Sequence, residues 1–135
     1  AGKPYTPEVQ ASILEGMEKR YILGLTLLGG EPFEPENQPA VLALCRAVRE
    51  KFPEKTIWCY SGYTLETDIL AGRLGPKDIT MELLGQLDVL VDGEFHLEEK
   101  DPSLRFRGSR NQRIIDVKKT METGETVLWD GRKEP

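Results

Sequence analysis

The sequence predicts a single α/β domain, residues 1–135, built around a mostly parallel sheet. Three short apolar runs, at residues 23–28, 56–60 and 88–92, alternate with segments in which apolar residues recur at helical spacing. The runs do not alternate apolar and polar residues, which favours strands that are buried on both faces. Short connections between helices and strands further imply right-handed crossovers between parallel strands.

Local signals place the helices between these strands. Thr6 is a typical N-cap, with Pro7 at the first helical position, and Pro53 ends the helix before the second strand. Thr64 and Gly72 are expected to cap and end a short helix after that strand. We therefore expect helices over residues 7–19, 65–71 and 78–86, and one that begins after Asn37 or Gln38, at Pro39 or just before it, and runs to about residue 51.

The pattern changes after residue 92. Residues 105–112 are polar and typical of a loop. Residues 113–117 and 126–129 are expected to form two further strands, joined by a short turn that contains Gly124.

The composition and charge exclude several classes of protein. The net charge of −5 argues against a nucleic-acid-binding surface, and basic residues cluster in one loop region only. The clustered residues are Arg105, Arg107, Arg110 and Arg113. No apolar run approaches the ~20 residues of a membrane helix, and the first residues lack the hydrophobic stretch of a signal peptide. We therefore expect no nucleic-acid partner and no membrane partner.

Cys45 and Cys59 are the two cysteines of the chain. One falls in a predicted helix and the other in a predicted strand, so both are interpreted as small core residues. Two such cysteines make neither a disulfide framework nor a metal site, and a reducing cytoplasm is the expected location.

Glycine-containing turns follow all three predicted parallel strands. These turns are Gly29-Gly30-Glu31, Ser61-Gly62 and Asp92-Gly93-Glu94. The carboxyl ends of parallel strands meet at one edge of a sheet, where α/β folds bind small molecules, and glycine lets a ligand approach the backbone closely. The alternative is a set of tight turns with no ligand. Three polar glycine turns at the same edge favour a small-molecule site.

Several segments, taken in order, resemble one known family. Gly29-Gly30-Glu31-Pro32 is similar to the Gly-Gly-Glu-Pro element of radical S-adenosylmethionine (SAM) enzymes. The other similar segments are Trp58 with Ser61-Gly62-Tyr63, residues 89–95, Asp101-Pro102-Ser103-Leu104, Arg107-Gly108-Ser109 and Asn111-Gln112. Together they resemble the activating proteins of anaerobic ribonucleoside-triphosphate reductase, which are glycyl-radical-enzyme activases, over residues 6–129.

The resemblance implies a fold, an activity and partners. The implied fold is a partial (β/α) barrel of the radical SAM type, with its first strand missing from this chain. The implied activity is reductive cleavage of SAM with a [4Fe–4S] cluster, which generates the glycyl radical on anaerobic ribonucleoside-triphosphate reductase. That reductase is the implied partner, and the resemblance allows a reduced flavodoxin-like protein as the electron donor.

The resemblance also implies site residues but no catalytic side chain. The implied cofactor-binding residues are Gly29, Gly30, Glu31, Ser61 and Asp92. The first three would bind the methionine ammonium through their backbone, and the last two would lie over the ribose or methionine. Arg107 and Asn111 are the implied contacts of the reductase, the alternative being a solvated turn. His96 is interpreted as a surface or loop histidine, and Glu31 is not expected to act as a base.

One departure from the family is large. The family holds its cluster with a Cys-x3-Cys-x2-Cys loop, and this chain has no such loop. We expect the cluster cysteines upstream of Ala1, so that no metal ligand lies in this chain and the chain alone is inactive. The alternative is a cluster-free fragment that acts only as a SAM- or nucleotide-binding module or as a docking module.

Overall fold

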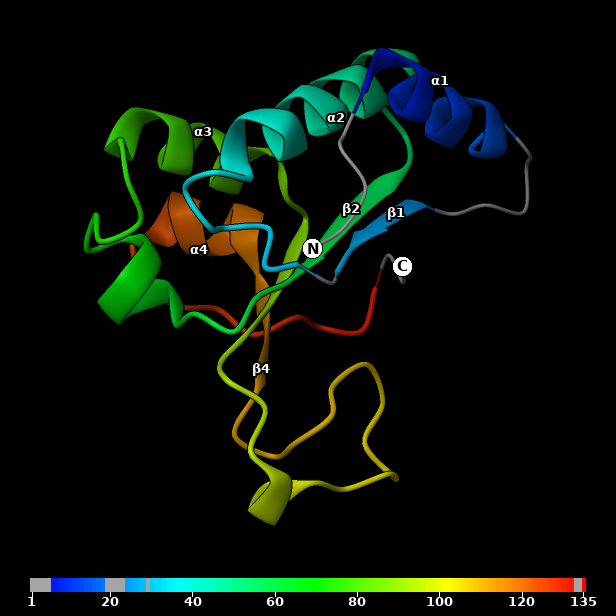
Figure 1. Ribbon diagram of the computed structural model, residues 1–135. Helices are drawn as coiled ribbons and strands as arrows, with labels where there is room; N and C mark the ends of the chain where they lie inside the picture. The colour runs from blue at the N-terminus through cyan, green and yellow to red at the C-terminus, as the bar shows by residue number, and fades with distance from the viewer. Residues whose placement is uncertain (1–5, 19–23, 29, 133–134) are drawn as a thin grey trace.

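The computed structural model describes residues 6–18, 24–28, 30–132 and 135. Helices and strands alternate through its first two thirds, as Figure 1 shows. In chain order the elements are α1 (Pro7–Gly16), β1 (Gly24–Leu27), α2 (Gln38–Lys51), β2 (Thr56–Tyr60), η1 (Leu65–Ile69), α3 (Lys77–Gln86), β3 (Val89–Asp92), η2 (Leu97–Glu99), β4 (Arg113–Asp116) and α4 (Val117–Thr123). The α/β class predicted from the sequence is confirmed.

Within the described residues, four strands form one open sheet in the order β1-β2-β3-β4. β1 pairs with β2 and β2 pairs with β3 in parallel, as predicted, whereas β4 runs antiparallel to β3. The sheet is not closed, so these four strands confirm the α/β class but not the predicted partial barrel. Its carboxyl edge is formed by the ends of β1, β2 and β3 and by the start of β4.

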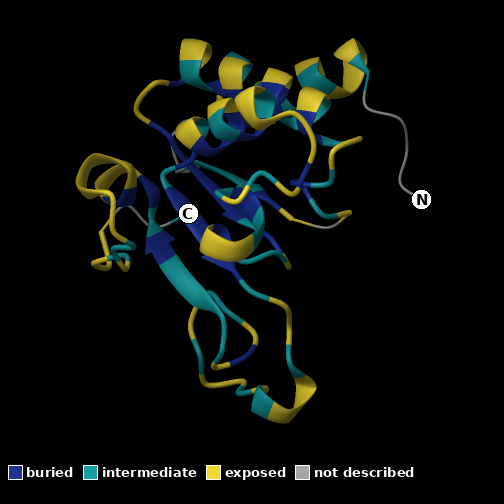
Figure 2. Cartoon of the chain, turned by 90° about the vertical axis from the view of Figure 1, so that its left-hand side faces the viewer, coloured by how far each residue is buried: buried dark blue, intermediate teal, exposed yellow. Residues whose placement is uncertain are grey.

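The two faces of the sheet are covered differently. Helices α2 and α3 pack on one face, where Ile57, Cys59 and Leu90 join the main hydrophobic core. On the other face Trp58 is fully buried against Phe106 and Trp129, with ring centroids 5.2 and 4.9 Å away in edge-to-face geometry. Figure 2 shows the buried strands below the helices and the more exposed β3–β4 loop projecting away from them.

Several predicted boundaries change in the structure. Helix α1 ends at Gly16 rather than at residue 19, and residue 19 lies outside the described residues. The hydroxyl of Thr6 caps this helix as predicted, accepting a hydrogen bond from the N–H of Val9 at 3.2 Å. Thr64, in contrast, makes no side-chain cap, and the following turn is π-helical over Leu65–Ile69.

The C-terminal prediction is partly wrong. The strand predicted at residues 113–117 is present as β4, but it leads directly into helix α4, which was not predicted. Asp116 caps that helix by accepting from the N–H of Lys119 at 2.9 Å, and Gly124 ends it with a φ of +76°. The strand predicted at residues 126–129 is reduced to one bridge between Leu128 and Ile115. This segment instead places Trp129 against Trp58.

Candidate functional site

The site begins in the loop that follows β1. Gly30 is exposed and has a φ of +53°, which glycine adopts without strain. The side-chain amide of Asn37 donates to the carbonyl oxygens of Gly30 and Glu31, at 2.6 and 3.0 Å. These hydrogen bonds within the loop therefore fix its conformation. Gly29 lies outside the described residues.

The carboxylate of Glu31 joins this loop to the end of β2. It accepts hydrogen bonds from the hydroxyl of Ser61 at 2.9 Å and from the N–H of Gly62 at 2.7 Å. It also accepts from the N–H of Phe33 at 2.9 Å. Two of the three turns expected to share one edge are thus in direct contact.

Two adjoining cavities lie at this edge of the sheet. One, of about 240 Å³, is lined by Gly30, Glu31, Pro32, Tyr60, Ser61, Gly62, Gly93, Phe95 and Gln112. The other, of about 290 Å³, is lined by Gly62, Thr64, Asp68, Asp92, Gly93, Glu94, His96, Asn111 and Arg113. Ligand pockets typically measure about 300–1,000 Å³, so the pair of cavities has the size that a small molecule needs. The described residues of all three predicted turns border this space.

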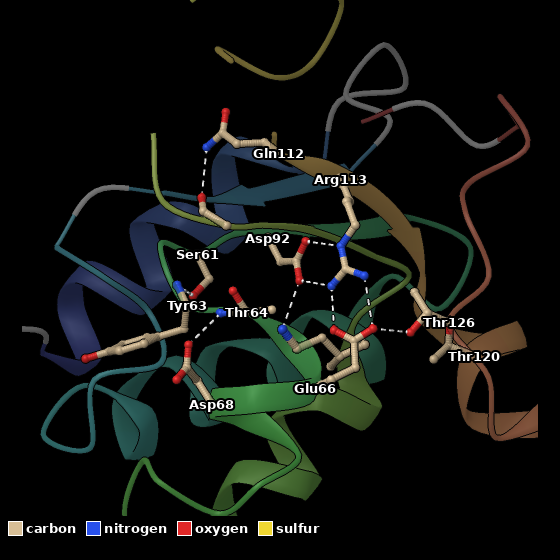
Figure 3. A network of polar contacts seen from close by, with 12 residues as sticks. Ser61, Tyr63, Thr64, Glu66, Asp68, Asp92, Gln112, Arg113, Thr120 and Thr126 are labelled. Atoms are coloured by element: carbon tan, nitrogen blue, oxygen red, sulfur yellow. Dashed lines mark hydrogen bonds and ion pairs between the residues drawn. The ribbon is translucent and has the colours of Figure 1, made fainter. Parts of the chain in front are cut away.

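Asp92 lies at the boundary of the second cavity but is held by the protein. Its side chain is 1% exposed, and Arg113 donates to both of its carboxylate oxygens, at 3.0 and 2.5 Å (Figure 3). The N–H of Leu65 donates to it as well, at 2.9 Å. Arg113 also donates to both oxygens of Glu66, and these bonds lower the pKa of Glu66 to about 2. The network connects η1, β3 and β4 below the site.

Residues of the β3–β4 loop brace one another. Arg107 donates to the carbonyl of Gln112 at 2.7 Å, and Asn111 donates to the carbonyl of Glu94 at 2.7 Å. The two residues expected to contact a partner are therefore also the residues that shape this loop. His96 is partly exposed, as interpreted from the sequence, and its hydrogen bond to Glu99 raises its pKa.

Sequence reasoning did not assign Gln112 to the site. Its side-chain oxygen accepts from the N–H groups of Gly108 and Ser109, and its amide donates to the carbonyl of Gly93 at 3.1 Å. Gln112 also lines the first cavity. Its place in the Asn111-Gln112 segment was the available signal, although that segment alone does not say which side chain faces the cavity.

Neither cysteine fits a cluster-binding role. Cys45 and Cys59 are fully buried, which raises the pKa of Cys45 to about 12 and that of Cys59 well above its ordinary value. A buried thiol resists the deprotonation that metal ligation requires. Within the described ranges, no group of three or more His, Cys, Asp or Glu side chains is placed to hold a metal ion. Both cysteines are core residues, as predicted.

A larger cavity, of about 340 Å³, lies at the opposite end of β3 beside Asp88. Both lysines of its rim have partners, since Lys119 lies 3.3 Å from Asp130 and Lys118 donates to the carbonyl of Gly85 at 3.0 Å. We assign the site to the carboxyl edge because the glycine turns converge there. No helix in the described part of the chain is long and apolar enough to cross a membrane.

The described residues form an α/β protein with two adjoining cavities at the carboxyl ends of its parallel strands. A family model described as a 4Fe-4S single cluster domain matches residues 1–115. The anaerobic ribonucleoside-triphosphate reductase-activating protein of Pasteurella multocida (strain Pm70) is 37% identical over 116 residues, covering 84% of this chain and 70% of that protein. The chain belongs to the family of anaerobic ribonucleoside-triphosphate reductase-activating proteins.

Other relatives carry the same name. The protein of Vibrio cholerae is 42% identical over 117 residues, covering 84% of this chain and 70% of that protein. The protein of Escherichia coli (strain K12) is 36% identical over 114 residues, covering 83% of this chain and 69% of that protein. No solved structure matches the chain significantly.

Proposed function

We propose that this chain acts in the activation of an anaerobic ribonucleoside-triphosphate reductase, as a radical SAM activase that generates the glycyl radical of that enzyme. Besides family membership, one structural observation supports the proposal. The described parts of the three glycine turns line adjoining cavities at one edge of the sheet. We further propose that the open sheet belongs to a partial barrel of the radical SAM type and that the protein works in the cytoplasm.

The cleft suits a ligand that carries a cationic group. The carbonyl oxygen of Gly30 accepts a hydrogen bond from Asn37 and has a second lone pair, whereas that of Glu31 already accepts from Asn37 and from the N–H of Glu34. An ideal Cβ on Gly30 would meet no atom within 4 Å, so the backbone is accessible to a ligand. We propose that the methionine ammonium of SAM is bound here, with Gly29 in the same turn.

Ser61 and Asp92 have more indirect roles in this proposal. The hydroxyl of Ser61 donates to Glu31 and accepts from the N–H of Tyr63 at 3.1 Å. Both oxygens of Asp92 accept from Arg113. Each residue would therefore border the ribose or methionine of SAM while its polar atoms hold the walls of the cleft.

The reductase is proposed to dock on the β3–β4 loop beside the cleft. Arg107 and Asn111 belong to this loop, which projects from the body of the protein. A partner segment that contacts this loop would lie next to the cavity that Gly93, Phe95 and Gln112 line.

Cluster chemistry is not assigned to the residues of this chain, because its cysteines do not fit. A [4Fe–4S] cluster in such activases supplies the electron that cleaves SAM, and it needs cysteine thiolates held close together. Cys45 and Cys59 are buried core thiols. This observation favours a second candidate function for the chain by itself, namely binding SAM or docking to a partner without redox chemistry.

Three measurements on the 135-residue chain test these proposals. Calorimetric titration with SAM should give saturable binding, and surface plasmon resonance should detect association with the anaerobic reductase. After anaerobic reconstitution with iron and sulfide the chain should show no stoichiometric [4Fe–4S] absorbance. Absence of both SAM binding and reductase binding would contradict the proposed function, and stoichiometric cluster binding would contradict the assignment of both cysteines to the core.

A further inference from the structure

Glu31 adopts a backbone conformation that its residue type disfavours. Its φ is +39°, and non-glycine residues rarely occupy this left-handed region. Such conformations persist where surrounding contacts determine them, and they occur often at functional sites. The contacts of Glu31 therefore decide whether the strain has a role.

Five hydrogen bonds hold Glu31 in this conformation. Its carboxylate accepts from Phe33 within its own loop and from Ser61 and Gly62 at the end of β2. Its carbonyl accepts from the side chain of Asn37 and from the N–H of Glu34. The bond to Ser61 spans 30 residues of sequence, so Glu31 fastens the β1–α2 loop to the neighbouring strand.

A second contact fastens the same two segments. The hydroxyl of Tyr63 donates to the carboxylate of Glu34, and this bond raises the pKa of Tyr63 to about 12. The buried amide of Gln38 donates to the carbonyl of Phe33 at 2.7 Å and to that of Leu74 at 2.9 Å. The loop is thus fixed at both ends, and Glu31 provides its contact nearest the cleft.

We propose that Glu31 is a positioning residue whose carboxylate sets the distance between the Gly30 turn and the Ser61–Gly62 turn, and so the width of the cleft. Three donors of the protein already use its carboxylate oxygens, so the side chain serves the protein rather than a ligand. Gly30, directly before it, remains exposed at the rim. This inference depends on the proposed function only in taking SAM as the ligand of the cleft.

The test is Glu31→Gln in the 135-residue chain, with Glu36→Gln as the matched control. Glu36 is an exposed glutamate of the same loop. A glutamine amide nitrogen cannot accept a hydrogen bond, so E31Q loses at least one of the three donors. Phe33 and Gly62 donate to different carboxylate oxygens, so we expect the amide hydrogen of whichever residue faces the new NH2 group to exchange about tenfold faster in E31Q, and affinity for SAM to fall about tenfold. E36Q should change neither quantity.

A double-variant cycle separates positioning from direct contact. In S61A the carboxylate keeps its bonds to Phe33 and Gly62, so a smaller loss of affinity is expected. Because the two side chains act through one contact, E31Q/S61A should bind SAM about as weakly as E31Q. S61A also keeps the test open if E31Q fails to fold, because a carboxylate no longer bonded to Ser61 should hold Gly62 less firmly and exchange at Gly62 should rise, by less than in E31Q.

The outcomes distinguish this inference from the proposed function. If the unmodified chain binds no SAM, the proposed function fails, and the exchange measurement still decides whether Glu31 fixes the two turns. Unchanged exchange at Phe33 and Gly62 in E31Q would overturn the inference. A loss of SAM affinity in E31Q without faster exchange would also overturn it, because the carboxylate would then contact the ligand directly.

Discussion

Arg113→Met should destabilise the protein strongly, because it leaves a buried carboxylate without its cationic partner. Asp92 is 1% exposed, and Arg113 donates to its two oxygens at 3.0 and 2.5 Å. In R113M the backbone N–H of Leu65 would remain as a donor to that carboxylate, at 2.9 Å. One hydrogen bond does not compensate for burial of a full charge.

The magnitude follows from the burial of each partner. Removing one partner from a buried ion pair costs about 3–5 kcal/mol. The side chain of Glu66 is 42% exposed, so solvent limits the loss of its pair with Arg113 to about 0.5 kcal/mol. The free energy of unfolding should therefore fall by roughly 3–5 kcal/mol, almost entirely through Asp92. Removing both charges in D92N/R113M should recover about 1–3 kcal/mol of this loss.

Urea unfolding at neutral pH measures this effect through tryptophan fluorescence, since Trp58 is fully buried against Trp129. The matched control is Arg132→Met, because Arg132 is 87% exposed and lies 3.8 Å from Asp130. That exposed pair should contribute less than about 0.5 kcal/mol. A loss below about 1 kcal/mol in R113M, or a double variant no more stable than R113M, would refute the reasoning.

Acid stability should depend on Glu66, whose pKa its hydrogen-bonded arginine lowers from 4.5 to about 2. Its contribution is complete above the unfolded-state pKa and is lost as the pH falls through 4.5 toward 2, so E66Q should flatten the acid limb of unfolding curves by about 1 kcal/mol. Gly30→Val should weaken calorimetric SAM binding in a protein that still folds, because valine strains the φ of +53° although a Cβ there meets no atom within 4 Å. Gly24→Ala should cost about 1–3 kcal/mol in urea unfolding, because its Cβ would lie 2.2 Å from the carbonyl oxygen of Thr56. Gly85→Ala, with nothing within 4 Å, should instead gain about 0.5–1 kcal/mol. Identical acid limbs, unchanged SAM affinity in folded G30V, or equal stabilities of the two alanine variants would contradict these expectations.

The sequence was sufficient for the parallel part of the fold. Non-alternating apolar runs predicted β1, β2 and β3 and their parallel pairing, and β2 has the predicted bounds. Helix α4 was missed because it has seven residues, too few for a clear helical period. The strand predicted at residues 126–129 failed because packing of Trp129 on Trp58 overrides its local strand preference.

The edge at which the glycine turns meet was also a property of the sequence, because parallel strands in a short helix–strand alternation must end on the same side. The sequence did not indicate the hydrogen-bond partners of the polar side chains. Glu31 lies 30 residues from Ser61, and Asp92 lies 21 residues from Arg113. Such pairs depend on strand order, register and the path of a loop, none of which a local pattern specifies. The sequence therefore determined that the glycine turns share one edge of the sheet, and the tertiary structure decided that the carboxylates of Glu31 and Asp92 hold the walls of the cavities there.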